Sequence, residues 1–271
     1  MIRLAATVML VRPAEHAPFE VFMLRRSEAS HFVPDVYVFP GGTLDPSDLS
    51  EEAFARTKGI DESSLRLQFR VQAPPSLPAH ADRPDDRECA GLTIAAVREL
   101  FEEAGVLLAC DAGGRALPDR AFEPVRERLH AARAQVHSGR LQFHELLREL
   151  DVYANGAALA LFSQWITPPV YPRRYNAHFF VAVADADQAA TADTVETHDG
   201  IWIAPGDALE RSSRGEFSMV YPTVKHLERL AQFRTSAALV DFARTKRIYT
   251  VMPKTPGEHQ FSLPADLEYA W

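Results

Sequence analysis

Apolar side chains recur along the chain with two different periods, which predicts that strands and helices both occur throughout. Apolar-rich runs of strand length, bounded by Pro, Gly or polar residues, are found at residues 3–11, 20–25, 36–39, 158–166, 176–184 and 200–204. Helical spacing is found at residues 93–104, 119–134, 141–150 and 221–233, and a Pro-Gly-Asp sequence near residue 205 predicts another helix start. Thr93 is the predicted N-cap of the first of these helices, and Gly105 follows its end.

Residues 45–90 interrupt this pattern. The segment holds several prolines among many charged residues, which are typical of connecting segments. Within it, residues 49–57 have the spacing of a short helix, and the stretch SLRLQFRVQ at residues 64–72 alternates apolar and polar residues as a strand does. We interpret the segment as an insertion and not as a separate domain.

The helix predicted for residues 93–104 has an apolar face and an acidic face. At about 100° per residue, one third of the helix surface collects Ile94, Val97, Leu100, Phe101 and Ala104. Glu99, Glu102 and Glu103 share the other side at i, i+3 and i+4, with Arg98 as the adjacent cation. One interpretation is a solvated acidic surface. The other is a site for a hard divalent cation such as Mg²⁺, which prefers oxygen ligands.

Two consecutive glycines follow the apolar run that ends at Phe39. In the stretch FPGGTLD, Pro40 ends a strand, and Gly41 and Gly42 lack the side chains that would keep another group away from the backbone. This stretch therefore predicts a loop that another part of the site approaches closely.

Composition and charge narrow the class of protein. The chain has 271 residues, 46% of them apolar, and a formal net charge of −8, which argues against sequence-independent binding of nucleic acid. No apolar run reaches the about 18–20 residues that a membrane-spanning helix needs, so we expect no membrane partner. The two cysteines, Cys89 and Cys110, are too few for a disulfide framework and form no CxxC pair, so we expect a cytoplasmic location.

The acidic helix and the paired glycines together resemble the Nudix box, G-x5-E-x7-R-E-U-x-E-E-x-G-U, where U is an apolar residue. Residues 98–106, RELFEEAGV, match its second half, and FPGG resembles the strand end and loop that open it. The spacing departs from the family, because Gly42 and Arg98 lie about 42 residues further apart than in the box. Eight positions before Arg98, where the box has its first Glu, the chain has Ala90, so Glu88 is the candidate partner of Arg98.

Within the Nudix family, the long insertion resembles the branch of peroxisomal coenzyme A diphosphatases. The stretches LRRSEASHFVPDVYVFPGGTLD and SQWITPPVYPRRYNAHFF extend the likeness to residues 24–45 and 163–180. The resemblance implies an α/β/α Nudix sandwich with a mixed curved sheet, formed by one domain over residues 1–271. It also implies insertions at about 45–90 and about 115–155.

The same resemblance implies hydrolysis of a diphosphate linkage with Mg²⁺, for which Mn²⁺ is a possible substitute. Glu99, Glu102 and Glu103 would bind the metal together with the carbonyl group of Gly42, and Arg98 would orient the glutamates through its hydrogen bonds. The substrate would be a small nucleotide-type molecule, for which charge neutralisation and positioning carry most of the catalysis.

Five residues outside the box are further site candidates. Glu196, just before a predicted strand, is a candidate general base, and a glutamate of the box is the alternative. Arg25 and Arg26 follow a predicted strand in the region that marks the coenzyme A branch, and Arg173 and Arg174 precede another strand. Each arginine pair either binds substrate phosphate groups or forms a solvated surface.

The sequence leaves the substrate and one alternative function open. Coenzyme A or acyl-coenzyme A is the leading substrate, and NADH, ADP-ribose and nucleotide sugars are the alternatives. A catalytically silent Nudix module that binds a nucleotide is the hypothesis from another class, which Ala90 favours and the intact glutamates oppose. The helices predicted within residues 119–150 either cover the pocket or form a contact in a homodimer.

Overall fold

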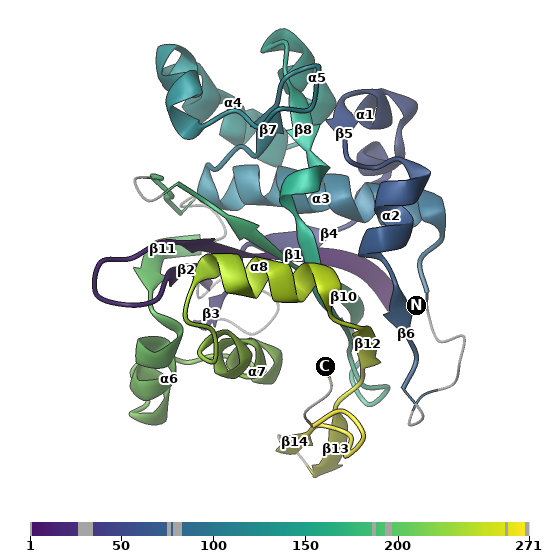
Figure 1. Ribbon diagram of the computed structural model, residues 1–271, viewed down its shortest axis with the longest axis vertical. Coiled ribbons are helices and arrows are strands. Elements are labelled where there is room, and N and C mark those ends of the chain that lie inside the picture. The colour runs from purple at the N-terminus through teal and green to yellow at the C-terminus, as the bar shows by residue number, and fades with distance from the viewer. Residues whose placement is uncertain are drawn as a thin grey trace.

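The structure of the protein, a computed structural model, describes residues 2–26, 35–74, 77, 83–185, 188–192, 197–257, 260–268 and 271. Its centre is a mixed sheet of nine strands in the order β11-β2-β1-β10-β9-β12-β6, with β3 beside β2 and β4 beside β1 (Figure 1). The bounds of these strands, in the same order, are Thr197–Ile203, Glu20–Arg26, Ile2–Arg12, Arg174–Val183, Ala160–Ile166, Ile248–Val251, Val71–Gln72, Tyr37–Val38 and Gly41–Thr43.

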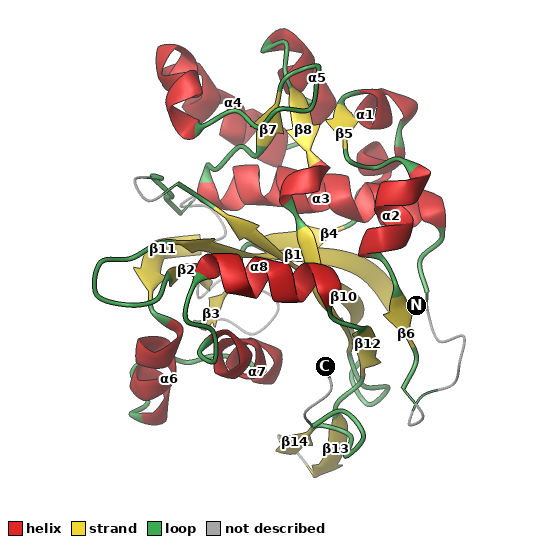
Figure 2. Ribbon diagram, viewed as in Figure 1, coloured by secondary structure: helices red, strands yellow, loops and turns green. Residues whose placement is uncertain are grey.

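Helices cover both faces of this sheet, which gives three layers (Figure 2). One face carries α1 (Glu51–Ala55), α2 (Glu62–Gln68), α3 (Asp86–Ala104), α4 (Arg126–His137) and α5 (Phe143–Glu149). The other face carries α6 (Pro205–Ser213), α7 (Tyr221–Leu230) and α8 (Ser236–Thr245). The predicted α/β/α sandwich is confirmed.

Shorter elements complete the described part of the chain. They are the 3-10 helices η1 (Pro46–Leu49), η2 (Asp119–Val125) and η3 (Gly156–Ala158), the small sheet of β5 (Thr57–Lys58), β8 (Tyr153–Asn155) and β7 (Ala109–Cys110), and the hairpin of β13 (Lys254–Gly257) and β14 (Gln260–Ser262). No helix in the described ranges has both the length and the apolar character needed to cross a membrane.

β1 is buried on both faces of the sheet. Ala6, Val8 and Leu10 enter the apolar cluster that contains α3, whereas Met9 and Val11 enter the cluster on the side of α6, α7 and α8. Burial on both faces explains why this strand is a nearly continuous apolar run in the sequence. β1 is therefore a rigid base for whatever pairs with it.

The glycine loop is fastened to this base. β4 pairs with β1 in antiparallel register, with Gly42 opposite Ala6 and Gly41 opposite Thr7. On the other side β1 pairs in parallel with β10 along almost its whole length. Helix α3 crosses the sheet directly above β1 and β4 (Figure 1). The acidic helix and the paired glycines, far apart in sequence, thus lie side by side.

Two sequence expectations about the elements are wrong, and one helix was missed. The acidic helix begins at Asp86 and not at Thr93, because Asp85 caps it; Thr93 lies inside the helix and its hydroxyl donates to the Cys89 carbonyl at 3.0 Å. Residues 64–72 are mostly the helix α2, and the remaining strand is β6 alone. Helix α8 was not predicted.

The spacing of apolar residues explains the error at 64–72. Leu65 is 6% exposed and packs with half-buried Phe69, which is the i, i+4 spacing of a helix face, whereas Leu67 is 67% exposed. The alternation in the sequence is therefore incidental, and the cap that Asp61 provides for the Ser64 N–H favours the helix.

Candidate functional site

Caps at both ends fix where the acidic end of α3 lies. The Asp85 carboxylate accepts from the Glu88 N–H at 2.8 Å, and the Glu88 carboxylate accepts from the Asp85 N–H at 2.9 Å. Gly105 ends the helix in the left-handed conformation, with φ of 70°. In the last turn, Glu102 and Glu103 are 5% and 8% exposed. The interpretation of this face as a solvated acidic surface is therefore wrong.

Arg98 joins the acidic side chains into one buried network. Its Nε and one terminal nitrogen donate to the two oxygens of Asp48, at 2.8 and 2.9 Å. The other terminal nitrogen donates to Oε1 of Glu99 and Oε1 of Glu102, both at 2.9 Å. Burial alone would lower the pKa of Arg98, but the hydrogen bond to Asp48 and the charges of the carboxylates raise it overall. The guanidinium group therefore stays charged inside the site.

The partner of Arg98 is Asp48, so the expectation of Glu88 is wrong. Asp48 is 1% exposed and forms a bidentate pair with the guanidinium group, whereas the carboxylate of Glu88 caps its own helix. Asp48 lies six positions after Gly42, which is the place of the first acid when the box is counted from its glycine. The additional residues follow Asp48, and Ala90 does not stand for the missing acid. Counting from the glycine identifies Asp48 in the sequence.

The two glycines are required by different neighbours. A Cβ atom on Gly42 would lie 2.2 Å from Oε1 of Glu99, so this glycine leaves room for the carboxylate. A Cβ atom on Gly41 would lie 2.4 Å from the carbonyl oxygen of Ala6 in β1, and the Gly41 N–H donates to Glu103 at 2.7 Å. The close approach predicted for this loop is confirmed, and the groups that approach it are β1 and two glutamates.

The charge balance of the site favours a cation. Four acidic side chains, Asp48, Glu99, Glu102 and Glu103, are held next to the single positive charge of Arg98 and the glycine loop. Burial raises the pKa of Glu99 to about 7 against the lowering effect of Arg98, and the charge of Glu102 adds to the rise. Burial is the main cause of this rise, so it is the excess of carboxylates over the guanidinium group of Arg98 that favours a cation.

These residues fit a hard divalent metal, although they are not arranged as a ready cage. Among the described residues, no group of three acidic, His or Cys side chains stands at ligand positions. The donor set is nevertheless carboxylate and carbonyl oxygen, which Mg²⁺ prefers, and the absent side chain at Gly42 leaves the Glu99 carboxylate room against the loop backbone. Glu99, Glu102, Glu103 and Gly42 are thus brought together, as the sequence analysis expects.

Helix α4 brings two further side chains to the acidic end of α3. The Nε of Arg133 donates to the main-chain carbonyl of Glu102 at 2.6 Å, and the Nδ1 of His137 lies 3.4 Å from Oε2 of the same residue. Neither Arg133 nor His137 is among the site residues predicted from the sequence. They lie outside the Nudix box and more than 30 positions from Glu102, so no local motif marks them.

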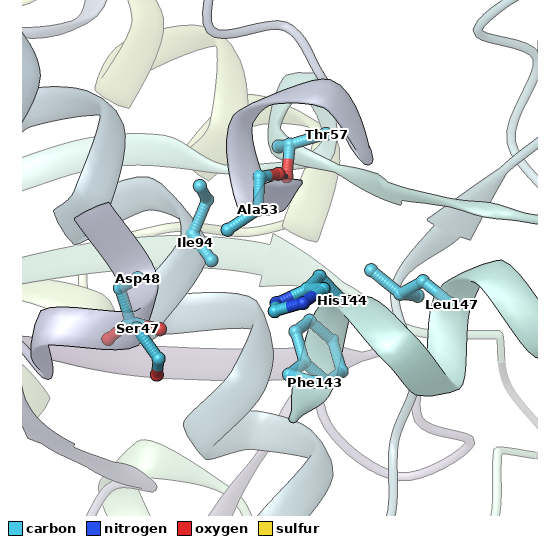
Figure 3. A pocket seen from close by; sticks show the side chains of 8 residues that line it. All are labelled: Ser47, Asp48, Ala53, Thr57, Ile94, Phe143, His144 and Leu147. Atoms are coloured by element: carbon cyan, nitrogen blue, oxygen red, sulfur yellow. Dashed lines mark hydrogen bonds between the residues drawn. The ribbon is translucent and has the colours of Figure 1, made fainter. Parts of the chain in front are cut away.

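A small cavity lies next to Asp48. It is lined by Ser47 and Asp48 of η1, Ala53 of α1, Thr57 of β5, Ile94 of α3, and Phe143, His144 and Leu147 of α5 (Figure 3). Its volume is about 10 Å³, which is room for no more than about one water molecule. Asp48 is therefore closely surrounded by the elements that follow the glycine loop and by α5, and this cavity is too small for a substrate.

The two candidate substrate arginines of β2 lie beside β3, the strand that leads into the glycine loop. Arg25 is opposite Tyr37 in β3, four residues before Gly41, and its Nε donates to Asp35 at 2.7 Å. Arg26 ends β2, opposite Thr197 of β11. Contact of either side chain with a substrate stays a prediction.

The other candidate arginine pair lies further from the carboxylates. Arg174 is level with Ile2 at the start of β1 and donates from Nε to the Thr167 carbonyl at 2.9 Å, and Arg173 next to it is exposed. Ala6, which is opposite Gly42, lies four residues further along β1, a distance of roughly 13 Å. The structure does not bring this pair to the acidic network.

The candidate base Glu196 lies outside the described residues. The chain before it is anchored at the site, because the Thr191 N–H donates to the Ala104 carbonyl at 3.0 Å and the Thr191 carbonyl accepts from Arg133 at 2.7 Å. The role of Glu196 stays a prediction.

Comparison with known proteins gives matches to both sequence and fold. The acyl-coenzyme A diphosphatase NUDT19 of Xenopus laevis is 29% identical over 232 residues, covering 79% of this chain and 60% of the relative. The protein of the same name from Homo sapiens is 32% identical over 246 residues, covering 85% and 65%. The chain thus spans less than two thirds of the length of these two relatives.

The fold has a close counterpart among solved structures. The crystal structure of a Nudix hydrolase from Alicyclobacillus acidocaldarius superposes with a TM-score of 0.64 at 24% identity, covering 89% of this chain and 96% of that one. The family model of the NUDT19 Nudix domain matches residues 1–230, which contain both halves of the box, Asp48 and helix α4. The chain belongs to the NUDT19 Nudix domain family.

Proposed function

We propose that this protein is a Mg²⁺-dependent diphosphatase that hydrolyses coenzyme A or acyl-coenzyme A. The observation that carries the proposal is the buried network of Arg98 with Asp48, Glu99 and Glu102. This network brings together in space the two halves of the Nudix box, which are far apart in the sequence. The glycine loop completes it through the hydrogen bond from Gly41 to Glu103.

The residues of the chain hold and orient the reacting groups. Glu99, Glu102, Glu103 and the carbonyl of Gly42 would hold the ion, with Mn²⁺ as a possible substitute. When bound, the ion would neutralise charge on the diphosphate and lower the pKa of a water molecule. Arg98 orients Glu99 and Glu102 by donating to Oε1 of each, which leaves the second oxygen of Glu99 and the remaining lone pairs of Glu102 for the ion.

The hydrogen bonds around Arg98 do not identify the general base, so its assignment is part of the proposal. Either a glutamate of the box or Glu196 takes the proton of the attacking water. An inactive Glu196→Gln variant with wild-type affinity for Mn²⁺ would identify Glu196 as the base, and wild-type turnover in this variant would favour a glutamate of the box.

The choice of coenzyme A rests on the relatives and on the length of the candidate surface. Two relatives of this chain carry the name acyl-coenzyme A diphosphatase. Arg25 and Arg26 lie beside the strand that leads into the glycine loop, and Arg173 and Arg174 lie at the start of β1, roughly 13 Å from the level of the loop. A long substrate with several phosphate groups suits arginines spread in this way. NADH, ADP-ribose and nucleotide sugars are the alternative substrates.

The silent binding module loses the observation that favoured it. That hypothesis rested on Ala90 in place of the first acid of the box. Asp48 fills this role, with two hydrogen bonds to Arg98 of 2.8 and 2.9 Å. A module without catalytic activity has no need of the four acidic groups gathered at Arg98.

The compartment and the assembly complete the proposal. A reducing cytoplasm is supported by Cys89 and Cys110, which are both buried and free. A homodimer is one of the two roles left open for the helices within residues 119–150, and light scattering of the purified chain tests it.

A comparison of substrates tests the proposed function. The purified chain is incubated with Mg²⁺ and, separately, coenzyme A, acetyl-coenzyme A, NADH, ADP-ribose and a nucleoside triphosphate, and kcat/KM is measured for each. We expect the highest value for a coenzyme A substrate, with 3′,5′-ADP and a phosphopantetheine compound as products. A higher value for another diphosphate would keep the reaction and reject the substrate. Binding without any cleavage would favour the silent module.

A further inference from the structure

Helix α4 holds the main chain of the metal-binding helix. The last carbonyl groups of an α-helix have no partner within the helix, and α3 has no basic residue in its last turn. Arg133 of α4 supplies a hydrogen-bond donor for one of these carbonyl groups and a positive charge. It is 7% exposed, and its Nε donates to the Glu102 carbonyl at 2.6 Å. Its positive charge also lies at the negative end of the helix dipole. Arg133 therefore fixes the backbone of Glu102.

The same face of α4 reaches the side chain of Glu102. His137 follows Arg133 by four residues, so both side chains point to the same side of the helix. The His137 Nδ1 lies 3.4 Å from Oε2 of Glu102, and Oε1 of Glu102 accepts from Arg98 at 2.9 Å. An ionised carboxylate only accepts hydrogen bonds, so His137 interacts favourably with Oε2 in the forms that carry a hydrogen on Nδ1. Both oxygens and the carbonyl of Glu102 thus have defined neighbours.

We propose that His137 is a positioning residue for Glu102 and that α4 thereby sets the affinity of the metal site. The inference rests on the proposed function, because it treats Glu102 as a metal ligand. A carboxylate that can rotate about its last bond loses order when it binds an ion. A carboxylate already oriented by a neighbouring donor loses less, and removal of such outer partners lowers metal affinity about 10–100-fold.

A purely structural role for His137 is the alternative. His137 is 24% exposed through its side chain and ends the helix, so it also packs between α3 and α4. The two roles differ in what replaces the imidazole. Asn presents a donor near the position of Nδ1 and fills less space, whereas Leu fills the space and offers no donor.

Metal titration of the full chain decides between them. Wild type, His137→Asn, His137→Leu and His130→Leu are freed of metal and titrated calorimetrically with Mn²⁺ alone, without substrate. His130 is the matched control, because it is an exposed histidine of the same helix. Thermal unfolding of each variant verifies that it is folded.

We expect the dissociation constant for Mn²⁺ to rise about tenfold or more in His137→Leu, to stay within about threefold in His137→Asn, and to be unchanged in His130→Leu. Wild-type affinity in folded His137→Leu, or equal weakening by Asn and Leu, would overturn the positioning role. In either case wild-type binding and hydrolysis would leave the proposed function intact. If the wild type itself binds no Mn²⁺ and cleaves no diphosphate, the proposed function fails and the inference fails with it.

Discussion

At the scale of single residues, the site depends on one buried ion pair. Asp48 and Arg98 are 1% and 8% exposed and share two hydrogen bonds. A buried guanidinium group that loses such a partner is left without compensation for its desolvation. The pair therefore affects both the stability of the fold and the orientation of Glu99 and Glu102, which bind to the same guanidinium group.

Removal of Asp48 tests this dependence. We predict that Asp48→Ala lowers the free energy of unfolding by about 3–5 kcal/mol, because it breaks the buried bidentate pair and leaves the Nε of Arg98 without its acceptor, while the bonds to Glu99 and Glu102 remain. Glu88→Ala is the control, and we expect it to cost less than about 1 kcal/mol, since it removes one exposed hydrogen bond of the capping box and an acidic group at the helix N-terminus. Urea unfolding in metal-free buffer measures both. Equal effects of the two substitutions would contradict the assignment of Asp48 as the partner of Arg98.

The paired glycines predict two different phenotypes. In Gly42→Ala the added Cβ atom displaces the flexible end of Glu99, so the fold survives and the affinity for Mn²⁺ falls about tenfold or more. In Gly41→Ala the Cβ atom meets backbone atoms of β1, 2.4 Å from the Ala6 carbonyl, and the φ of 157° is unfavourable for alanine. We expect a stability loss of about 1–3 kcal/mol for this variant.

Urea unfolding and Mn²⁺ titration of the two glycine variants distinguish the sites. The account requires Gly42→Ala to be the variant that is stable but weak in metal binding. The reverse outcome, with a stable Gly41→Ala and an unfolded Gly42→Ala, is incompatible with the neighbours described for each glycine.

At the scale of elements, the residue that follows α8, Lys246, is a buried lysine on the sheet face opposite to α3. The Nζ of Lys246 donates to the Phe162 carbonyl at 2.8 Å and lies over the rings of Phe162 and Phe242 at 4.3 and 5.5 Å. Burial lowers the pKa of Lys246 to about 7, and the charge of Arg229 adds to the lowering. The free energy of unfolding is therefore linked to pH through this side chain.

The sign of the linkage follows from the proton count. Between about pH 7 and pH 10.5 the unfolded chain keeps a proton on Lys246 that the folded chain has released, so stability rises with pH in this window. Lys246→Met removes this contribution. We predict that the stability of the wild type relative to Lys246→Met increases from pH 6.5 to pH 9.5, as measured by urea unfolding. A difference that is constant with pH would show that Lys246 keeps its ordinary pKa.

Trp271 packs in the apolar cluster between the sheet and helices α6, α7 and α8. Trp271 is 4% exposed, and its ring centroid lies 5.1 Å from that of Trp165 and 5.1 Å from that of His226. We predict that Trp271→Ala lowers the free energy of unfolding by about 3–5 kcal/mol, the usual cost of removing a buried aromatic ring. Phe261→Ala, at a half-buried ring of the C-terminal segment, is the control and costs less. Equal losses would argue against a core role for Trp271.

Much of the architecture is predictable from local pattern, and the failures share a physical cause. β1 and the second half of β10 are nearly continuous apolar runs, and the acidic helix ends at its glycine, so these elements are visible in the sequence. The predicted start of α3 is wrong because threonine is a common N-cap residue. In the structure the Thr93 hydroxyl instead donates to the Cys89 carbonyl within the helix. Local propensity does not reveal which of two competing hydrogen bonds forms.

At the scale of the whole molecule, the catalytic box is assembled from parts that are distant in sequence. β1 pairs with the glycine loop, and α3 carries the glutamates above it. Ala53 and Thr57, which follow Asp48, line a small cavity together with residues of α5 (Figure 3). The metal-ligand candidates were predictable because they follow a motif. Arg133 and His137 were not, because their contacts depend on how α4 packs on α3, which no spacing within the motif encodes.

A comparison of the products of the wild type and of one variant tests most directly whether the acidic end of α3 hydrolyses coenzyme A. The wild type and Glu102→Gln are incubated with coenzyme A and Mg²⁺, and the products are identified by mass spectrometry. We predict 3′,5′-ADP and phosphopantetheine from the wild type, and turnover lower by about 10²-fold or more in Glu102→Gln, which keeps the shape of the side chain and loses its charge. Equal turnover by a folded Glu102→Gln variant would show that the acidic end of α3 is not the site of hydrolysis.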